Sequence, residues 1–135
     1  MKVYYFLTAV LLLFFNSQSS KAQSSDVIDD ICGLIKTCDT KGLSKYYFAS
    51  TVELGILTEE DVYSKVQAEQ ILKDFFNKHN PNSVKVVHRL VSNPDYKFAV
   101  VLINTDKGRF RTSFSMKNTG SKFLITEMRI EYNKE

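Results

Sequence analysis

The sequence predicts an α+β domain in which helices pack on one face of a mainly antiparallel sheet. Two observations support this prediction. Apolar residues follow a mostly helical spacing before residue 80, and they alternate with polar residues in four segments after it. Short turns separate these four segments, so neighbouring strands must run antiparallel. Helices followed by a strand meander are typical of a two-layer arrangement.

The first 22 residues have the pattern of a secretory signal peptide. Lys2 precedes an apolar run from Val3 to Phe15, and the small residues Ser20 and Ala22 occupy the −3 and −1 positions of a cleavage site. An uncleaved anchor is the alternative, but the run is shorter than the roughly 20 residues that a helix needs to cross a membrane. We therefore expect export to the periplasm or beyond. Residues 23–135 are expected to form a single domain without membrane attachment after cleavage.

Cleavage also removes most of the apparent basicity of the chain. The whole sequence has 18 basic and 15 acidic residues, and the loss of Lys2 and Lys21 leaves 16 basic residues against 15. A nearly neutral domain has no electrostatic basis for binding nucleic acid or an anionic membrane surface. Neither is expected as a partner.

Two helices are expected at the start of the domain. Apolar residues recur at helical spacing over residues 26–38, and three aspartates stand in the first turn, where the helix dipole favours negative charge. Asp39 and Thr40 then provide a cap for a short helix that ends at Tyr46 or Tyr47.

The two cysteines lie in the first of these helices. Cys32 and Cys38 are six positions apart, which corresponds to about 9 Å along a helix axis. A disulfide requires Cα atoms within about 7 Å, so a bond requires the helix to end first, near Thr37. A disulfide and a pair of buried thiols both remain open.

A strand and the longest helix follow. Residues alternate from Thr51 to Leu57 as in a half-buried strand, and an acidic loop is expected over residues 58–61. Ser64 and Gln67 have the spacing of a capping box at the start of a helix, which ends at Asn80-Pro81-Asn82. Its apolar stripe consists of Ala68, Ile71, Leu72, Phe75, Phe76 and His79.

Four strands complete the chain, approximately Val84–Val91, Tyr96–Asn104, Arg109–Lys117 and Lys122–Tyr132. Alternation assigns an apolar face to three of them: Val84, Val86, His88 and Leu90; Phe110, Phe114 and Met116, with Thr112 among them; and Leu124, Met128, Ile130 and Tyr132. The strand over residues 96–104 is apolar on both faces. A partner on the outer face of the sheet explains that pattern, and so does a surplus of valine and isoleucine.

Three segments resemble one protein family. They are residues 62–65 (Val-Tyr-Ser-Lys), residues 67–76 and residues 128–131 (Met-Arg-Ile-Glu). The sequence resembles the secreted bacterial family named domain of unknown function 4783, within the nuclear transport factor 2-like, or cystatin-like, α+β superfamily. The resemblance implies a curved sheet around helices that leaves a cone-shaped pocket. It implies no catalytic residue, because the family has no assigned activity.

Motifs for common chemistry are absent from the sequence. There is no phosphate-binding glycine loop, dinucleotide fingerprint, HExxH zinc motif or GxSxG nucleophile motif. Both cysteines lie on an apolar stripe, and the chain has only two histidines. No cofactor or metal site is therefore expected, and an enzyme is less expected than a binding protein.

The pocket that the resemblance implies has a predicted lining of Tyr46, Tyr47, Tyr63, Phe76, His88 and Phe114. Tyrosine rings with hydroxyls at the mouth of a cone suit a ligand site, although rim packing is an alternative. His88 is the one catalytic candidate, because a histidine on the inner face could act as a general base near neutral pH. A histidine that only forms structural hydrogen bonds is the alternative.

Three functional hypotheses follow. The first is non-catalytic binding of a small apolar or amphipathic molecule in the cone. The second is an isomerase-like or hydratase-like enzyme that uses His88 with a tyrosine. The third is a homodimer or protein interaction module that uses the outer face of the sheet.

Overall fold

The structure is a computed structural model that describes residues 26–134, and the predicted signal peptide lies outside the described residues. The elements are α1 (Val27–Lys36), α2 (Thr40–Tyr47), β1 (Phe48–Ile56), β2 (Glu59–Ser64), α3 (Lys65–Lys78), β3 (Pro81–Leu90), β4 (Tyr96–Thr105), β5 (Gly108–Asn118) and β6 (Phe123–Tyr132). Within the described residues, no helix has the length and apolar character needed to cross a membrane.

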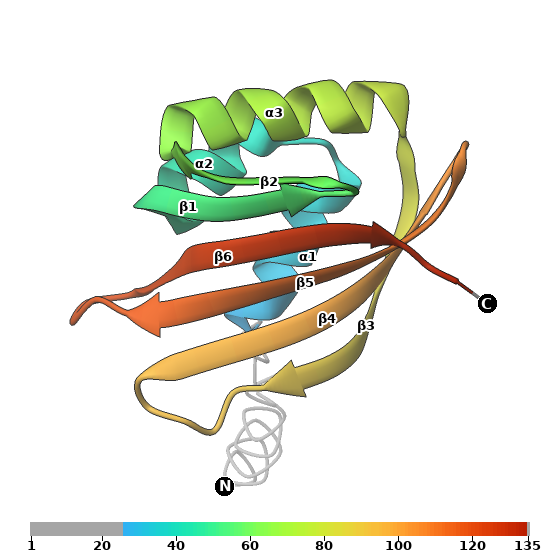
Figure 1. Ribbon diagram of the computed structural model, residues 1–135. Coiled ribbons are helices and arrows are strands. Elements are labelled where there is room, and N and C mark those ends of the chain that lie inside the picture. The colour runs from blue at the N-terminus through green and yellow to red at the C-terminus, as the bar shows by residue number, and fades with distance from the viewer. Residues whose placement is uncertain (1–25, 135) are drawn as a thin grey trace, which may run out of the picture.

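The strands form one sheet in the order β2-β1-β6-β5-β4-β3. All neighbouring strands are antiparallel except β1 and β6, which are parallel. The sheet is strongly curved and the helices lie on one side of it, with α3 running alongside the end formed by β1 and β2 (Figure 1). The predicted α+β class, with helices on one face of a mainly antiparallel sheet, is confirmed.

Aspartates cap the first two helices, and the cap of the second helix at Asp39 was predicted. The Asp26 side chain accepts a hydrogen bond from the backbone N–H of Ile28, and Asp39 accepts one from Gly42. Helix α1 ends at Lys36, and Cys38 has a left-handed backbone with a φ of 58° that turns the chain toward α2. Both cysteines are free thiols, although the helix ends before Cys38.

The prediction of a loop over residues 58–61 is wrong for residues 59–61, which begin strand β2. A two-residue turn at Leu57 and Thr58 joins β1 to β2, and Ile56 pairs with Glu59. Strand β2 forms an edge of the sheet, where its acidic side chains remain in solvent and its apolar residues give no alternating signal. Charged side chains on an edge strand also oppose pairing with another chain.

Helix α3 follows the prediction closely. Ser64 and Gln67 form the capping box, each side chain bonding to the other residue's backbone N–H at 3.2 Å. The stripe buries Ala68, Leu72, Phe75 and Phe76. His79 ends the helix, and its Nδ1 lies 3.0 Å from the carbonyl oxygen of Phe75.

A β-bulge in β3 overturns one predicted face. Val86 pairs with Val101, but His88 pairs with Val100, so Val87 is an extra residue. The bulge reverses the alternation after Val86. His88 and Leu90 therefore lie on the outer face, and Arg89 faces the helices. The prediction that His88 shares the inner face with Val84 and Val86 is wrong.

A second irregularity changes the predicted face of the last strand. Met116 pairs with Ile125 while Ser115 pairs with Glu127, so β6 also carries an extra residue. Ile125 is buried in place of the predicted Leu124, whereas Met128 and Ile130 face the core as expected. The predicted inner face of β5 is confirmed, because Phe110, Thr112, Phe114 and Met116 are all buried.

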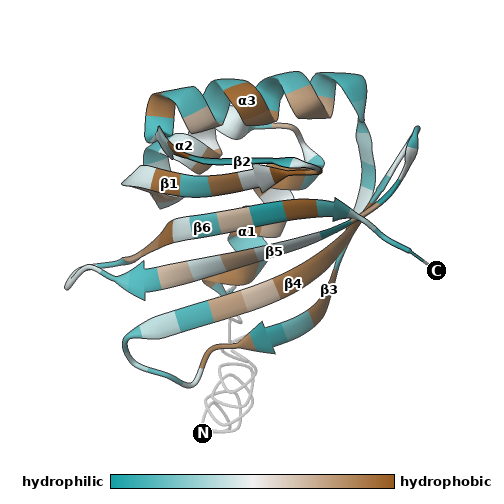
Figure 2. Cartoon of the chain, viewed as in Figure 1, coloured by the Kyte–Doolittle hydropathy of each residue, from teal (hydrophilic) through white to brown (hydrophobic). Residues whose placement is uncertain are grey.

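The core fills the space between the helices and the inner face of the sheet. Phe76 of α3 and Phe110 and Phe114 of β5 are among its largest fully buried side chains. Strand β4 contributes Ala99, Val101 and Ile103 to this core, and its apolar character extends along much of its length in Figure 2.

Candidate functional site

A groove with a volume of about 600 Å³ opens where the start of α1, the end of α2 and the starts of β4 and β6 meet. It is referred to below as the groove. Its lining residues are Asp26, Val27, Tyr46, Tyr47, Val91, Lys97, Lys122 and Phe123. This volume falls within the range of roughly 300–1,000 Å³ that is usual for sites of small ligands.

The α1 side of the groove is fixed by ion pairs to β3. Arg89 donates to the Asp26 carboxylate at 2.7 Å and to the Asp29 carboxylate at 2.9 Å. This contact exists because the bulge at Val87 turns Arg89 toward the helices. The interaction joins the first turn of α1 to the end of β3, and its single positive charge balances one of the two aspartate charges.

The α2 side of the groove is aromatic. Tyr46 is exposed, with Lys45 Nζ 5.2 Å from the centre of its ring. Tyr47 is half-buried and hydrogen-bonds to Asp30. Burial and then the neighbouring Asp30 carboxylate raise the pKa of the Tyr47 phenol above its ordinary value. The hydroxyl therefore stays protonated and donates to Asp30.

The sheet side of the groove carries two lysines and a phenylalanine. Lys97 pairs with the buried Met116, which places it on the inner face at the start of β4. Its Nζ lies 4.7 Å from the centre of the Phe123 ring. The Lys122 carbonyl accepts hydrogen bonds from the backbone and the hydroxyl of Thr119, which fix the turn before β6.

Two neighbouring loops hold this wall together. Asn118 donates its backbone N–H to the Asp95 carbonyl and its side-chain amide to the Pro94 carbonyl, both at 3.0 Å. These bonds tie the turn that carries Lys122 to the loop that leads into Lys97. The two lysines are thus carried by two backbone segments that are hydrogen-bonded to each other.

The structure brings together only two of the six predicted lining residues. Tyr46 and Tyr47 line the groove, whereas Phe76 and Phe114 are 2% and 1% exposed within the core. Tyr63 is half-buried on β2, where it pairs with Val52 and packs against the core. The predicted common pocket is not formed, because aromatic side chains occupy the interior of the cone.

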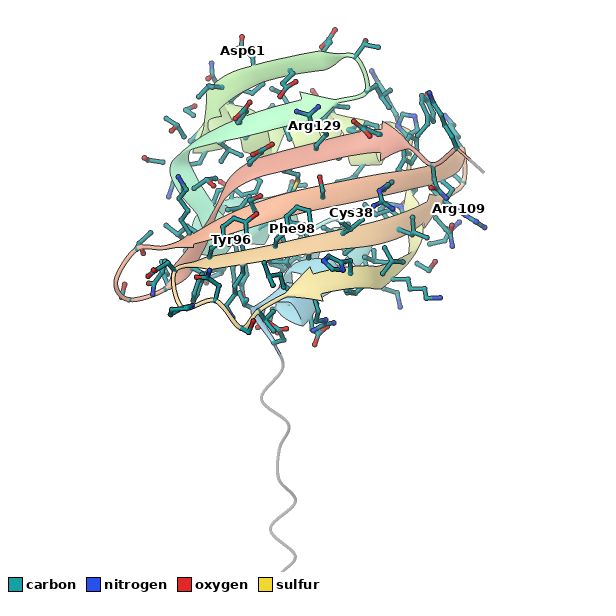
Figure 3. The ribbon with its side chains drawn as sticks, turned by 60° about the horizontal axis from the view of Figure 1, so that its bottom comes forward. Cys38, Asp61, Tyr96, Phe98, Arg109 and Arg129 are labelled. Carbon is teal, nitrogen blue, oxygen red and sulfur yellow. The ribbon has the colours of Figure 1, made fainter. Side chains whose placement is uncertain are left out.

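His88 lies apart from the groove. It is exposed on the outer face, with its ring 6.2 Å from that of Phe98. Figure 3 looks onto this face and shows Tyr96 and Phe98 along β4. The acid–base hypothesis required an inward-facing histidine, so this placement counts strongly against it.

The cysteines also lack the character of a nucleophile. Burial and the nearby Asp29 carboxylate raise the pKa of the Cys32 thiol to about 11, and burial raises the pKa of Cys38. The reactive thiolate is therefore scarce at neutral pH. Across residues 26–134, no three His, Cys, Asp or Glu side chains are grouped closely enough to hold a metal ion.

A second hollow of about 710 Å³ lies near the C-terminal end of β6. Its lining residues are Leu57, Thr58, Arg111, Glu131, Tyr132, Asn133 and Lys134. Arg111 and Glu131 are cross-strand partners, so this hollow has charges of both signs beside each other. It contains none of the predicted site residues.

A family model described as "Domain of unknown function (DUF4783)" matches residues 28–131. The chain belongs to the DUF4783 family. A crystal structure of a DUF4783 protein from Bacteroides uniformis is 25% identical, with a TM-score of 0.76 over 82% of this chain and 100% of that chain. No curated protein matches the sequence.

Two more distant structures place this DUF4783 protein within a wider fold group. An NTF2-like (nuclear transport factor 2-like) protein from Cytophaga hutchinsonii is 15% identical, with a TM-score of 0.58 over 80% of this chain and 97% of that chain. A domain with a cystatin-like fold from Nostoc punctiforme is 9% identical, with a TM-score of 0.60 over 78% and 72% of the two chains. The predicted NTF2-like fold is confirmed, and these likenesses show the fold alone.

Sequence reasoning missed the sheet side of the groove. The signal in the sequence was Lys97, a charged residue near the start of a predicted strand that is otherwise apolar on both faces. Lys122 and Phe123 gave no signal, because only the folded sheet places the start of β6 beside α1 and α2.

Proposed function

We propose that this DUF4783 protein is exported and binds a small amphipathic molecule in the groove, without catalysis. The observation that supports this most directly is the composition of the groove. Aromatic and aliphatic side chains stand beside a few polar groups at fixed positions, which is the usual composition of a small-molecule site. The outward-facing His88 and the protonated Cys32 favour binding over catalysis.

The test uses N-phenyl-1-naphthylamine, a neutral probe whose fluorescence rises in an apolar site. The protein is purified after export of the full chain, and the mass of the purified chain also tests cleavage after Ala22. Tyr46 and Tyr132 form a matched pair, because they are 54% and 55% exposed but line the groove and the second hollow respectively. Tyr46→Ala should weaken probe binding at least about three-fold, as expected from the loss of an aromatic contact.

Tyr132→Ala should leave probe binding unchanged. The opposite result, with binding lost in Tyr132→Ala and kept in Tyr46→Ala, would place the ligand in the second hollow and overturn the proposal. Failure of the probe to bind the parent protein at all would also overturn it.

Self-association through the outer face is a second candidate function. Phe98, Val100 and Leu102 form an apolar row on this face, and the neighbouring strand offers the small side chains of Ser113 and Ser115 beside it. Val100 is only 4% exposed, while Phe98 and Leu102 are half-buried. Sedimentation of the parent protein and of Phe98→Glu tests this candidate. A parent that remains monomeric at high concentration would rule it out.

A further inference from the structure

We infer that the groove selects amphipathic anions, with Lys97 and Lys122 receiving the acidic head and the apolar wall receiving the body of the ligand. This inference rests on the proposed function and adds the chemical class of the ligand. It depends on how charges are paired around the groove.

Lys97 occupies an unusual position for a lysine. The alternation of β4 directs it to the inner face, in line with the buried residues Ala99 and Val101. It is half-buried, and its ammonium group is held near the Phe123 ring at the edge of the groove. A cation over an aromatic ring is stabilised by the ring but keeps its full positive charge.

The positive charges of the groove are not neutralised by its own acids. Within residues 26–134, neither Lys97 nor Lys122 forms an ion pair with a carboxylate. Asp26, the one acid in the lining, is paired with Arg89, as is Asp29. Asp30 takes the hydrogen bond of the Tyr47 hydroxyl. Among the lining residues, two lysines stand against a single aspartate, which gives the lining a net charge of +1 for a ligand to satisfy.

The remaining lining suits an apolar body rather than a second charge. Val27, Val91 and Phe123 are the apolar side chains of the groove, and Tyr46 adds an exposed ring. A ligand that places one anionic group between the lysines can lay its apolar part on these side chains. A small polar anion would leave them in water and gain only the weaker, salt-screened charge interaction.

A pair of matched probes tests this inference on the protein purified after export of the full chain. 8-Anilino-1-naphthalenesulfonate has the same ring system as the neutral N-phenyl-1-naphthylamine, with an added sulfonate. In the double variant Lys97→Met and Lys122→Met, affinity for the sulfonate should fall about ten-fold, from the loss of two charge contacts of the usual strength for partly exposed pairs. Affinity for the neutral probe should change less than two-fold, because methionine keeps the apolar stem of the side chain.

Lys85→Met is the control, because Lys85 is an exposed lysine of β3 that does not line the groove. It should leave both affinities unchanged. Equal losses for the two probes in the double variant, or an unchanged affinity for the sulfonate, would overturn the inference while leaving the proposed function intact. If neither probe binds the parent protein, the proposed function and the inference both fall.

Discussion

Replacing Thr112 by valine should stabilise this protein. Thr112 is fully buried on the inner face of β5, and its hydroxyl has no hydrogen-bond partner among the described residues. Its cross-strand neighbours are Val101 and Ile130, which are also fully buried and offer no polar group. A buried polar group without a partner costs about 1–3 kcal/mol, and valine has nearly the same shape as threonine. Valine also retains the β-branched form that suits a strand.

We expect Thr112→Val to raise the free energy of unfolding by about 1–2 kcal/mol, the lower part of that range. For a domain of this size, each kcal/mol raises the melting temperature by about 4 °C. Urea denaturation followed by circular dichroism measures the change, and the slope of the transition should stay constant because the exposed surface is unchanged.

Thr105→Val provides a matched control for this substitution. The Thr105 hydroxyl donates to the Gly108 carbonyl at 2.8 Å and accepts from the Lys107 backbone N–H at 3.1 Å, in the turn between β4 and β5. Loss of these bonds should lower stability by about 0.5–1.5 kcal/mol. If Thr112→Val is less stable than the parent, the reasoning about an unsatisfied hydroxyl is refuted.

Three further predictions concern other parts of the fold. Arg89→Met should lower the free energy of unfolding by about 1 kcal/mol, because two partly exposed ion pairs to α1 are lost. If urea denaturation shows unchanged stability, these ion pairs do not help to hold α1 against β3. A hydrogen bond that the protonated Glu53 carboxyl donates to Glu60, and then the charge of Glu127, raise the pKa of Glu53 above its ordinary value. The native state therefore holds this proton more tightly than the unfolded state, and stability falls as the pH rises from the ordinary pKa of a glutamate to the raised pKa of Glu53. Glu53→Gln should therefore increase stability at pH 7 and flatten the acidic part of the stability curve measured by urea titration at several pH values. Cys38→Gly should raise stability by about 0.5–1 kcal/mol, because glycine adopts the φ of 58° without strain; a lower melting temperature would show that thiol packing outweighs the strain.

Local patterns in the sequence predicted most of the elements. The capping box of α3 and the apolar stripe that follows it can be recognised from residues that are close together in the sequence. The inner face of β5 follows from the alternation of polar and apolar residues alone. Strand β2 was missed, because an exposed edge strand needs no buried face and its turn at Leu57 contains no glycine. Its strand structure depends on backbone pairing with β1. The alternation of polar and apolar residues within one segment gives no information about pairing with another segment.

The candidate site was less predictable than the fold. Tyr46 and Tyr47 stood at a helix end and were identified, but Phe76 and Phe114 are core residues, and nothing local distinguishes a pocket wall from a packed interior. His88 was assigned to the wrong face because one inserted residue at Val87 reverses every later side chain of β3. The same reversal directs Arg89 to α1, where it binds Asp26 of the groove lining.

The sequence by itself determined the fold class, the family resemblance, the helix caps and the alternating faces of the regular strands. These features depend on spacing and side-chain type within a single element. Only the tertiary structure decided the extra residues at Val87 of β3 and within β6, the parallel pairing of β1 with β6 and the groove that joins α1, α2, β4 and β6. Where a strand accommodates an extra residue, and which distant side chains meet, both depend on packing between segments far apart in the chain.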